Sequence, residues 1–145
     1  MAARIRRAGV AVAFALLMAT ALTGAAWAAT KVGTNGSDLL IGTNARDTIY
    51  GLNGPDDVLA RASNDRLYGG SDSDEIHGGR NADYIVAGQG PDDLFGGRGT
   101  DVIEAADGFH EQDFVDCGLG LQDRAGVDAN DDVMNCEIVN GERAQ

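Results

Sequence analysis

A nine-residue repeat over residues 33–104 restricts this chain to a small set of folds. The eight units read GTNGSDLLI, GTNARDTIY, GLNGPDDVL, ARASNDRLY, GGSDSDEIH, GGRNADYIV, AGQGPDDLF and GGRGTDVIE. The sixth place is always aspartate: Asp38, Asp47, Asp56, Asp65, Asp74, Asp83, Asp92 and Asp101. The eighth place is always a large aliphatic residue: Leu40, Ile49, Val58, Leu67, Ile76, Ile85, Leu94 and Ile103. This strict period predicts a solenoid, in which each unit stacks on its neighbours.

Each unit divides into a turn of six residues and a short strand of three. Glycine, or less easily Asn or Asp, permits the positive φ that tight turns require, and these residues recur at the first, second and fourth places. A three-residue strand spans about 10 Å and cannot stand alone. We therefore expect each strand to pair in parallel with the strand two units later, at about 4.8 Å. Eight units then give about four coils around a narrow aliphatic core.

Residues 1–28 are typical of a secretory signal peptide. A basic head with three arginines precedes the apolar run Ala8–Leu22, and small residues follow at Ala26 and Ala28, where a signal peptidase reads. A transmembrane anchor is the alternative, but the uncharged run is shorter than the roughly 20 residues that a spanning helix needs. We expect cleavage after Ala28 and a secreted, extracellular protein. Residues 29–32 are then a short lead-in to the repeat.

The charge of the chain is strongly acidic. It has 23 Asp and Glu against 11 Lys and Arg, a formal net charge of −12. Such a surface repels phosphate backbones and anionic lipid, so we expect neither nucleic acid nor, after signal cleavage, a membrane as partner. A disordered acidic tail is the alternative, but it would not place an aliphatic residue at every ninth position. We therefore expect bound cations to balance the carboxylates.

Residues 105–145 lose the repeat and contain both cysteines, Cys117 and Cys136. In an exported chain an even pair predicts a disulfide, which in the chain-entropy model would stabilise by roughly 3 kcal/mol. Free thiols or a metal pair are the alternatives, but zinc fits poorly without histidine partners. Solenoids need atypical end units, so we expect a disulfide-stapled cap. Its strand-like pairs are Phe114-Val115, Val133-Met134 and Ile138-Val139.

The unit resembles the G-G-x-G-x-D-x-U-x nonapeptide of the RTX family. The resemblance covers residues 33–104; GGSDSDEIH, GGRNADYIV and GGRGTDVIE match best, and ARASNDRLY keeps only its Asp and its aliphatic residue. It implies an all-β fold, a right-handed parallel β-roll around calcium. Well-known RTX proteins use a C-terminal export signal and carry a toxin, protease or lipase domain. Because this chain has an N-terminal signal and no such domain, those activities are not carried over.

Stacking would place the sixth-place aspartates on two edges of the roll, each one strand spacing from the next. At about 4.8 Å, like charges repel by roughly 0.9 kcal/mol per pair even in the dielectric of water. Calcium reverses this repulsion because it accepts six to eight carboxylate and carbonyl oxygens. Magnesium requires a tighter octahedron, and zinc and copper favour the Cys and His ligands that these turns lack.

The gaps between stacked aspartates are the candidate calcium sites, three on each edge. We expect four to six Ca2+ ions, because the turn before Asp65 lacks glycine at three places and brings Arg61 and Arg66. Asp57 and Asp93 could add outer ligands, but we expect them to face solvent. The predicted carbonyl ligands belong to Gly33, Gly42, Gly51, Gly69, Gly78, Gly96, Asn35, Asn44, Asn53, Ser71, Arg80, Gln89 and Arg98. The predicted cap holds four acids, which could bind another cation but which we interpret as a solvated turn: Asp123, Asp128, Asp131 and Asp132.

The chain lacks the usual signatures of catalysis. Neither H-E-x-x-H nor G-x-S-x-G occurs, and the histidines are His77 and His110 alone. We therefore expect a non-enzymatic, monomeric calcium-binding protein whose folding is coupled to calcium, with its C-terminal coils filling first. A calcium-rigidified adhesive or structural module that binds a glycan or a protein is the alternative, and an accessory to a secreted hydrolase is a third. The outward ninth-place residues give no regular ligand face: Ile41, Tyr50, Leu59, Tyr68, His77, Val86, Phe95 and Glu104.

Overall fold

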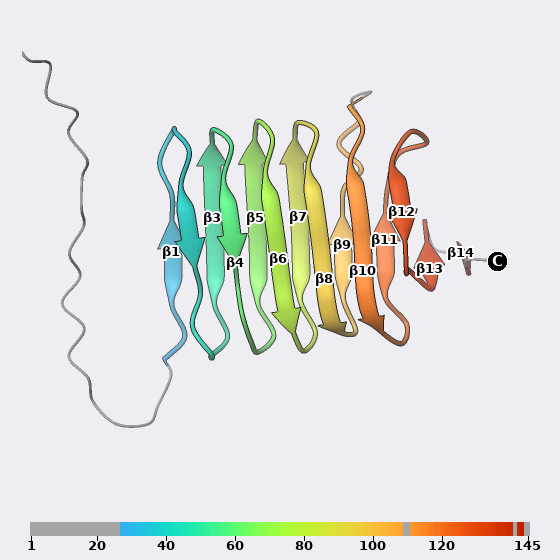
Figure 1. Cartoon of the computed structure of the whole chain (residues 1–145), viewed down its shortest axis with the longest axis horizontal. Helices are drawn as coiled ribbons and strands as arrows, with labels where there is room; N and C mark the ends of the chain where they lie inside the picture. Colours follow the sequence, from blue (N-terminus) through green and yellow to red (C-terminus); the bar gives the residue numbers. More distant parts are fainter. Residues whose placement is uncertain (1–26, 109–110, 141, 144–145) are drawn as a thin grey trace, which may run out of the picture.

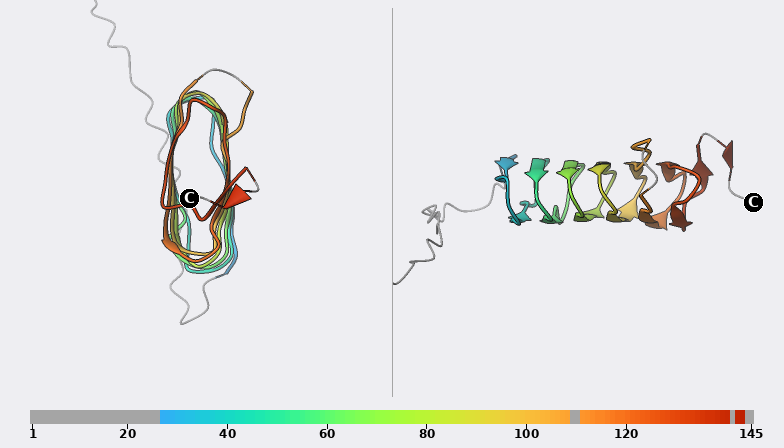
Figure 2. Two further views of the ribbon diagram at one scale, coloured as in Figure 1. Left: turned by 90° about the vertical axis from the view of Figure 1, so that its right-hand side faces the viewer. Right: turned by 90° about the horizontal axis from the view of Figure 1, so that it is seen from above.

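The computed structural model of the protein describes residues 27–108, 111–140 and 142–143. These residues form a parallel β-solenoid of about six coils, without a helix among them (Figure 1). Seen along its axis, the solenoid is a flattened tube (Figure 2). In the part described, no helix has the length and hydropathy needed to cross a membrane. The predicted signal peptide lies almost wholly outside the described residues and stays a prediction.

Two sheets form the broad walls of the tube, and the chain alternates between them. One sheet has the order β1-β3-β5-β7-β9-β11-β13-β14 and the other β12-β10-β8-β6-β4-β2. All pairs are parallel except β13 with β14. The strands are β1 (Thr30–Val32), β2 (Leu39–Ile41), β3 (Thr48–Asn53), β4 (Asp57–Leu59), β5 (Arg66–Ser71), β6 (Glu75–Arg80), β7 (Tyr84–Gln89), β8 (Asp93–Gly99), β9 (Val102–Glu104), β10 (Phe114–Gly120), β11 (Arg124–Gly126), β12 (Asp132–Met134), β13 (Ile138–Val139) and β14 (Glu142–Arg143).

The register between strands equals two repeat units, as predicted. Ile49 lies opposite Leu67, and Leu67 lies opposite Ile85. Because side chains alternate across a strand, the eighth-place residues all point inward. From the second unit to the eighth these side chains are fully buried: Ile49, Val58, Leu67, Ile76, Ile85, Leu94 and Ile103. The predicted aliphatic column is therefore the core of the roll.

The roll has more than the four coils that the repeat predicted, because it extends at both ends. The lead-in is its first strand: β1 pairs with β3, with Lys31 opposite Ile49. After the repeat, β10 to β13 continue both sheets in parallel, with Phe114 opposite Asp93 and Arg124 opposite Val102. The coil count was underestimated because neither end carries the nonapeptide.

The C-terminal segment ends the solenoid with irregular coils of the same architecture. Its predicted strand pairs lie within β10, β12 and β13. The predicted disulfide between Cys117 and Cys136 is confirmed, with a Cα–Cα distance of 5.1 Å. Both cysteines belong to the buried core cluster, so the disulfide joins the last coils from within.

From the third repeat unit to the eighth, the second and fourth places of the unit have positive φ. Gly79, at a second place, has a φ of 104°, and a side chain there would collide with the carbonyl oxygen of Arg61 in the preceding coil. In the unit ARASNDRLY these two places are held by Arg61 and Ser63, with φ of 83° and 91°. A residue other than glycine in this region costs about 1–2 kcal/mol. This unit therefore departs from the motif at the expense of backbone strain.

Replacing Arg61 with glycine is expected to stabilise the folded protein by up to about 1 kcal/mol. The strain relieved, about 1–2 kcal/mol, is partly offset by the greater freedom of glycine in the unfolded chain, about 0.5–1 kcal/mol. Arg80→Gly is the matched control, because Arg80 lies at a third place without positive φ; it should lose about 0.5–1 kcal/mol. Chemical denaturation in calcium measures both, and equal losses would contradict the strain argument.

Candidate metal centre

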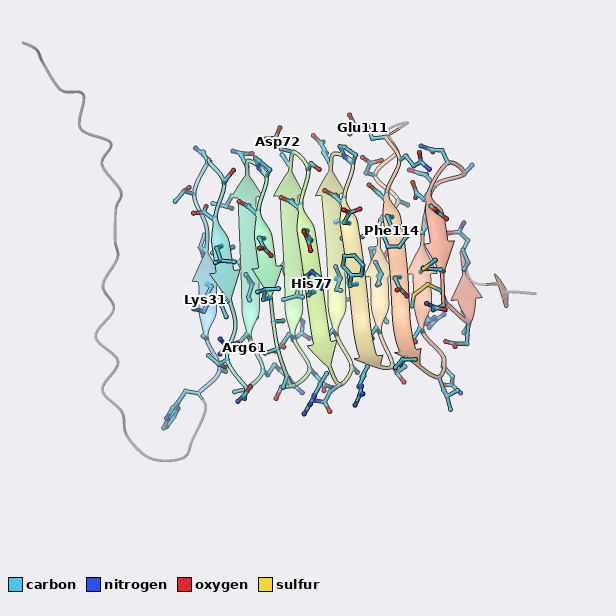
Figure 3. All side chains as sticks on the ribbon, viewed as in Figure 1. Lys31, Arg61, Asp72, His77, Glu111 and Phe114 are labelled. Atoms are coloured by element: carbon cyan, nitrogen blue, oxygen red, sulfur yellow. A yellow bond between two sulfur atoms is a disulfide. The ribbon has the colours of Figure 1, made fainter. Side chains whose placement is uncertain are left out.

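The sixth-place acids form a ladder along each edge of the roll, where the chain turns from one sheet to the other (Figure 3). The upper edge is the one near Asp72 and Glu111 in Figure 3, and the lower edge is the one near Arg61. The upper-edge acids are Asp38, Asp56, Asp74, Asp92, Asp113 and Asp131, and the lower-edge acids are Asp47, Asp65, Asp83, Asp101, Asp123 and Glu137. The structure therefore groups the eight predicted aspartates as their spacing required.

From Asp47 onward, each carboxylate of the ladders is held by a backbone N–H of the coil before it. The backbone N–H of Asp65 donates to Asp83 Oδ1 at 2.8 Å, and the backbone N–H of Asp74 donates to Asp92 Oδ1 at 2.8 Å. From Asp47 to Asp101 the sixth-place aspartates are at most 4 % exposed. One oxygen of each side chain is thus fixed by the fold, and the whole group is removed from water.

The other carboxylate oxygen, Oδ2, has no partner along most of both ladders. The buried ladder Oδ2 atoms without a hydrogen bond belong to Asp56, Asp65, Asp74, Asp83, Asp92, Asp101 and Asp123. Leaving a buried polar atom unsatisfied costs about 1–3 kcal/mol, and more for a charged group. Seven such oxygens in one small roll indicate sites built for a cation.

Glycine at the first place leaves the space into which Oδ2 points. A Cβ on Gly78 would lie 2.7 Å from Asp83 Oδ2 and 2.7 Å from the carbonyl oxygen of Gly96 in the next coil. On Gly96 it would lie 2.8 Å from Asp101 Oδ2 and 2.6 Å from the Cys117 carbonyl oxygen. A carboxylate and a carbonyl from successive coils therefore converge where no side chain fits, and these are the donors that calcium prefers.

Backbone oxygens must complete any such site. Within residues 27–108 and 111–140, no group of three His, Cys, Asp or Glu side chains is placed to hold a metal ion. The first-place carbonyls of Gly96 and Cys117 already face a ladder carboxylate. Each third-place residue precedes its sixth-place aspartate by three positions, and ligation by the third-place carbonyls stays a prediction: Asn35, Asn44, Asn53, Ser71, Arg80, Gln89 and Arg98.

The repeat itself identifies the family. The profile of the RTX calcium-binding nonapeptide repeat (4 copies) matches residues 32–67, 50–85 and 77–109, which together exceed half of the chain. The chain belongs to this RTX family. No curated protein and no solved structure matches it. RTX repeats bind calcium, and the stacked, buried aspartates of this roll fit that function.

Burial raises the pKa of the RTX ladder carboxylates. The pKa of Asp83 rises to about 8, mainly through desolvation and further through the charges of Asp101 and Asp65, against the lowering effect of the Asp65 N–H. Desolvation likewise raises the pKa of Asp92 to about 7. The pKa rises to about 6, again mainly through desolvation, in Asp65, Asp74, Asp101 and Asp113. Near neutral pH the ion-free roll must therefore hold protons or uncompensated charge.

Acidification is expected to stabilise the ion-free roll. Because the folded pKa values lie above the ordinary Asp value of 3.8, protonation favours folding, and this stability is lost as pH rises through about 6 to 8. Circular dichroism of protein freed of calcium on a chelating resin should show more strand at pH 5 than at pH 8. In millimolar calcium the order should reverse, because protons compete with the ion. An ion-free strand signal that is equal at both pH values would contradict this.

Threonine replaces glycine at the second place of the first two units and changes their sites. Thr34 donates its N–H and its hydroxyl to Asp38 Oδ2 at 2.5 and 2.9 Å. Thr43 donates in the same way to Asp47 Oδ2 at 2.5 and 3.0 Å. These two carboxylates are satisfied by the chain itself. The sequence prediction doubted the sites that use Asp65 but missed this difference at Asp38 and Asp47, although the second-place residue signals it.

The two edges differ in the charge around their ladders. On the upper edge Asp57, Glu75 and Asp93 follow the ladder acids and line one shallow groove. Asp57 and Asp93 are exposed there. The corresponding groove on the lower edge includes Arg46 and Arg66, and the charge of Arg46 opposes the rise in the pKa of Asp65. Cations should therefore be attracted more strongly to the upper edge.

Sequence reasoning missed the ladder acids beyond the repeat. The backbone N–H of Asp92 donates to Asp113 Oδ1 at 2.9 Å, and that of Asp101 donates to Asp123 Oδ1 at 2.8 Å. The interpretation of Asp123 as part of a solvated turn is wrong, since its side chain is fully buried. The turns after the repeat differ in length from those of the nonapeptide units, so the nine-residue period is lost there. A signal remains in four triplets of acid, any residue and aliphatic residue: DFV at 113, DRA at 123, DDV at 131 and EIV at 137.

Proposed function

We propose that the protein is an exported, monomeric calcium-binding β-roll that folds as it binds its ions. The seven buried, unpaired Oδ2 atoms carry this proposal. A cation between successive coils would satisfy these atoms and offset the repulsion between stacked carboxylates, and it would do so only in the folded state. We assign four to six ions to the nonapeptide repeats, in the coils from Asp56 to Asp101.

Three features support an extracellular role. The first 28 residues have the composition of a signal peptide. The disulfide between Cys117 and Cys136 belongs to an oxidising compartment. Shallow sites completed by backbone carbonyls are also of the kind that binds calcium at about 10⁻⁴–10⁻³ M, the range of extracellular modules.

The aromatic residues on the outer faces weigh against a glycan-binding role. Tyr50 stacks on Tyr68 with ring centroids 4.8 Å apart, and His77 stacks on Phe95 at 4.6 Å. The ninth-place residues are thus more ordered than their sequence suggested. Rings stacked on one another offer their edges to solvent, whereas a sugar packs on an open ring face. We interpret these two stacked pairs as cross-strand contacts that stabilise the sheets.

We further propose that the protein is not an enzyme. RTX repeats are binding and structural elements. His77 is engaged by Glu75 at 2.7 Å and by the ring of Phe95. The other histidine, His110, lies outside the described residues.

Calcium titration by isothermal calorimetry, together with ion counting by mass spectrometry after dialysis, tests the proposed function. We expect at least four ions per chain, with Kd values of about 10⁻⁴–10⁻³ M. Magnesium at the same concentrations should bind less and should not induce strand structure, because it keeps its waters and its octahedral geometry. A chain that retains no calcium at millimolar concentrations would overturn the proposal.

A further inference from the structure

The lower ladder continues past the last nonapeptide to Asp123. The family match ends at residue 109. Asp123 follows β10 and directly precedes β11, and its side chain is fully buried. The Asp101 N–H donates to Asp123 Oδ1 at 2.8 Å, within the 2.7–2.9 Å of the equivalent bonds inside the repeats. Asp123 therefore has the same hydrogen-bonding arrangement as the repeat aspartates, although the nonapeptide sequence is absent there.

Asp123 also has the unpaired oxygen of the repeat sites. Its Oδ2 is buried without a hydrogen-bond partner. Its own N–H donates to Glu137 Oε2 at 2.8 Å, so carboxylates from three successive coils, Asp101, Asp123 and Glu137, stack along the edge. In the described part of the chain no lysine or arginine forms an ion pair with Asp123. Among the described side chains, none therefore neutralises this buried carboxylate through an ion pair.

Three oxygens converge beside Gly120. A Cβ there would lie 2.6 Å from Asp123 Oδ2 and 2.8 Å from Asp123 Oδ1, and it would collide with the carbonyl oxygen of Gly99 in the preceding coil. In the repeats this space is left by a first-place glycine, but here Cys117 holds that place and its side chain forms the disulfide. The extra residue Gln122, with a φ of 74°, brings Asp123 to Gly120 instead.

The space lies beside a surface hollow and at a weak coil. The hollow is lined by Gly99, Gly118, Gly120, Asn135 and Glu137, among others. Ala125 takes the eighth place of this coil, opposite Ile103, so the core there is smaller than in the repeats. A ligand held by Asp123, just before β11, and by the Gly99 carbonyl at the end of β8 would offset this loss of apolar packing.

We propose that the turn between β10 and β11 binds a divalent cation of the calcium type through Asp123 and the Gly99 carbonyl, outside the nonapeptide repeats. This site rests on the proposed function, because it uses the same donor chemistry. The ion and the disulfide then hold the same end of the roll: Cys117 lies in β10, the strand before the turn that carries Asp123, and is bonded to Cys136. The calcium-dependent part of the fold thus extends to the disulfide.

Ion counting on Asp123→Asn tests the site. After dialysis against millimolar calcium, the variant should retain one ion fewer per chain than the wild type. Asp132→Asn is the matched control, because Asp132 is exposed at a seventh place of the next turn and lies outside the ladder; it should retain the wild-type number. Equal ion numbers in Asp123→Asn and the wild type would overturn the inference.

If the Asp123→Asn variant fails to fold, crystals of the wild-type protein grown in calcium provide a second test of the site. Anomalous scattering should give a peak beside Asp123 Oδ2 in addition to peaks along the repeats. Peaks along the repeats without one at Asp123 would overturn this inference alone. A roll without peaks on either edge would overturn the proposed function as well.

Discussion

Chelation of calcium at pH 8 is expected to abolish most of the strand signal of the protein, and millimolar calcium is expected to restore it. The ion-free roll must bury carboxylates whose Oδ2 atoms have no partner, at a cost of about 1–3 kcal/mol or more each. Each ion that binds only the folded state stabilises it by about 1.4 kcal/mol at ten times its Kd. Six such ions supply roughly 8 kcal/mol, which is comparable to the whole stability of a small domain.

Far-ultraviolet circular dichroism in EGTA and after calcium is added back measures this effect. Magnesium at equal concentration is the control, since a nonspecific effect of ionic strength would restore the signal equally well. The disulfide must stay oxidised throughout, because Cys117–Cys136 constrains the unfolded chain. A strand signal that chelation leaves unchanged would show that the roll stands without its ions.

The repeat allowed the core and the register to be predicted, because both follow directly from the period. Two units of nine residues make one coil, so Ile49 had to lie opposite Leu67 and Asp65 near Asp83, as they do. The two ends of the solenoid lack this period, so their strands could not be predicted in the same way. β1 carries no motif residue and is recognised only in the structure, where it pairs with β3 and the preceding Ala29 N–H donates to Asp47 Oδ1.

The C-terminal coils were hidden for a different reason. A coil needs an acid and an aliphatic residue at fixed places in its strand, but the length of its turns can vary. Between Asp92 and Asp113 the chain has three residues more than a coil of the repeat, and between Asp101 and Asp123 it has four more. The spacing is lost while the hydrogen bonds are kept. A search for the triplet, without a fixed period, would have found both.

Which carboxylate oxygens remain free for an ion depends on the second-place residue of the unit and not on the aspartate alone. The eight sixth-place aspartates look equivalent, yet Asp38 and Asp47 receive threonine hydroxyls while Asp56 keeps an unpaired Oδ2. That difference depends on the conformation of the second-place residue, which is a property of the folded turn. The structure therefore moves the expected ions away from the N-terminal end, in agreement with the cleaner turns of the later units.

Asp83→Asn is expected to change stability in opposite directions with and without calcium. The amide keeps the oxygen that accepts the Asp65 N–H, at 2.8 Å in the wild type, and replaces the unpaired charged oxygen with a donor. The carbonyl oxygen of Gly96 faces the same space and can accept from it. At pH 9, above the folded pKa of about 8, the ion-free variant should gain about 1–3 kcal/mol, because a buried charge is removed.

In calcium the same change removes a ligand. Asp83 stands between Asp65 and Asp101 on the lower edge, so both neighbouring gaps lose charge. At a hundred times Kd each lost ion removes about 2.7 kcal/mol, so the calcium-loaded variant should lose about 2–4 kcal/mol after the 1–3 kcal/mol gained by the ion-free form is subtracted. Denaturant midpoints in calcium, and the trimethylamine N-oxide concentration that folds the ion-free chain, measure the two effects. Asp93→Asn, at an exposed seventh place, should change neither by more than about 0.5 kcal/mol. Damage to packing would destabilise both the ion-free and the calcium-loaded form, so only an ion ligand predicts changes of opposite sign. A variant that is less stable in both conditions would show that Asp83 has a structural role alone.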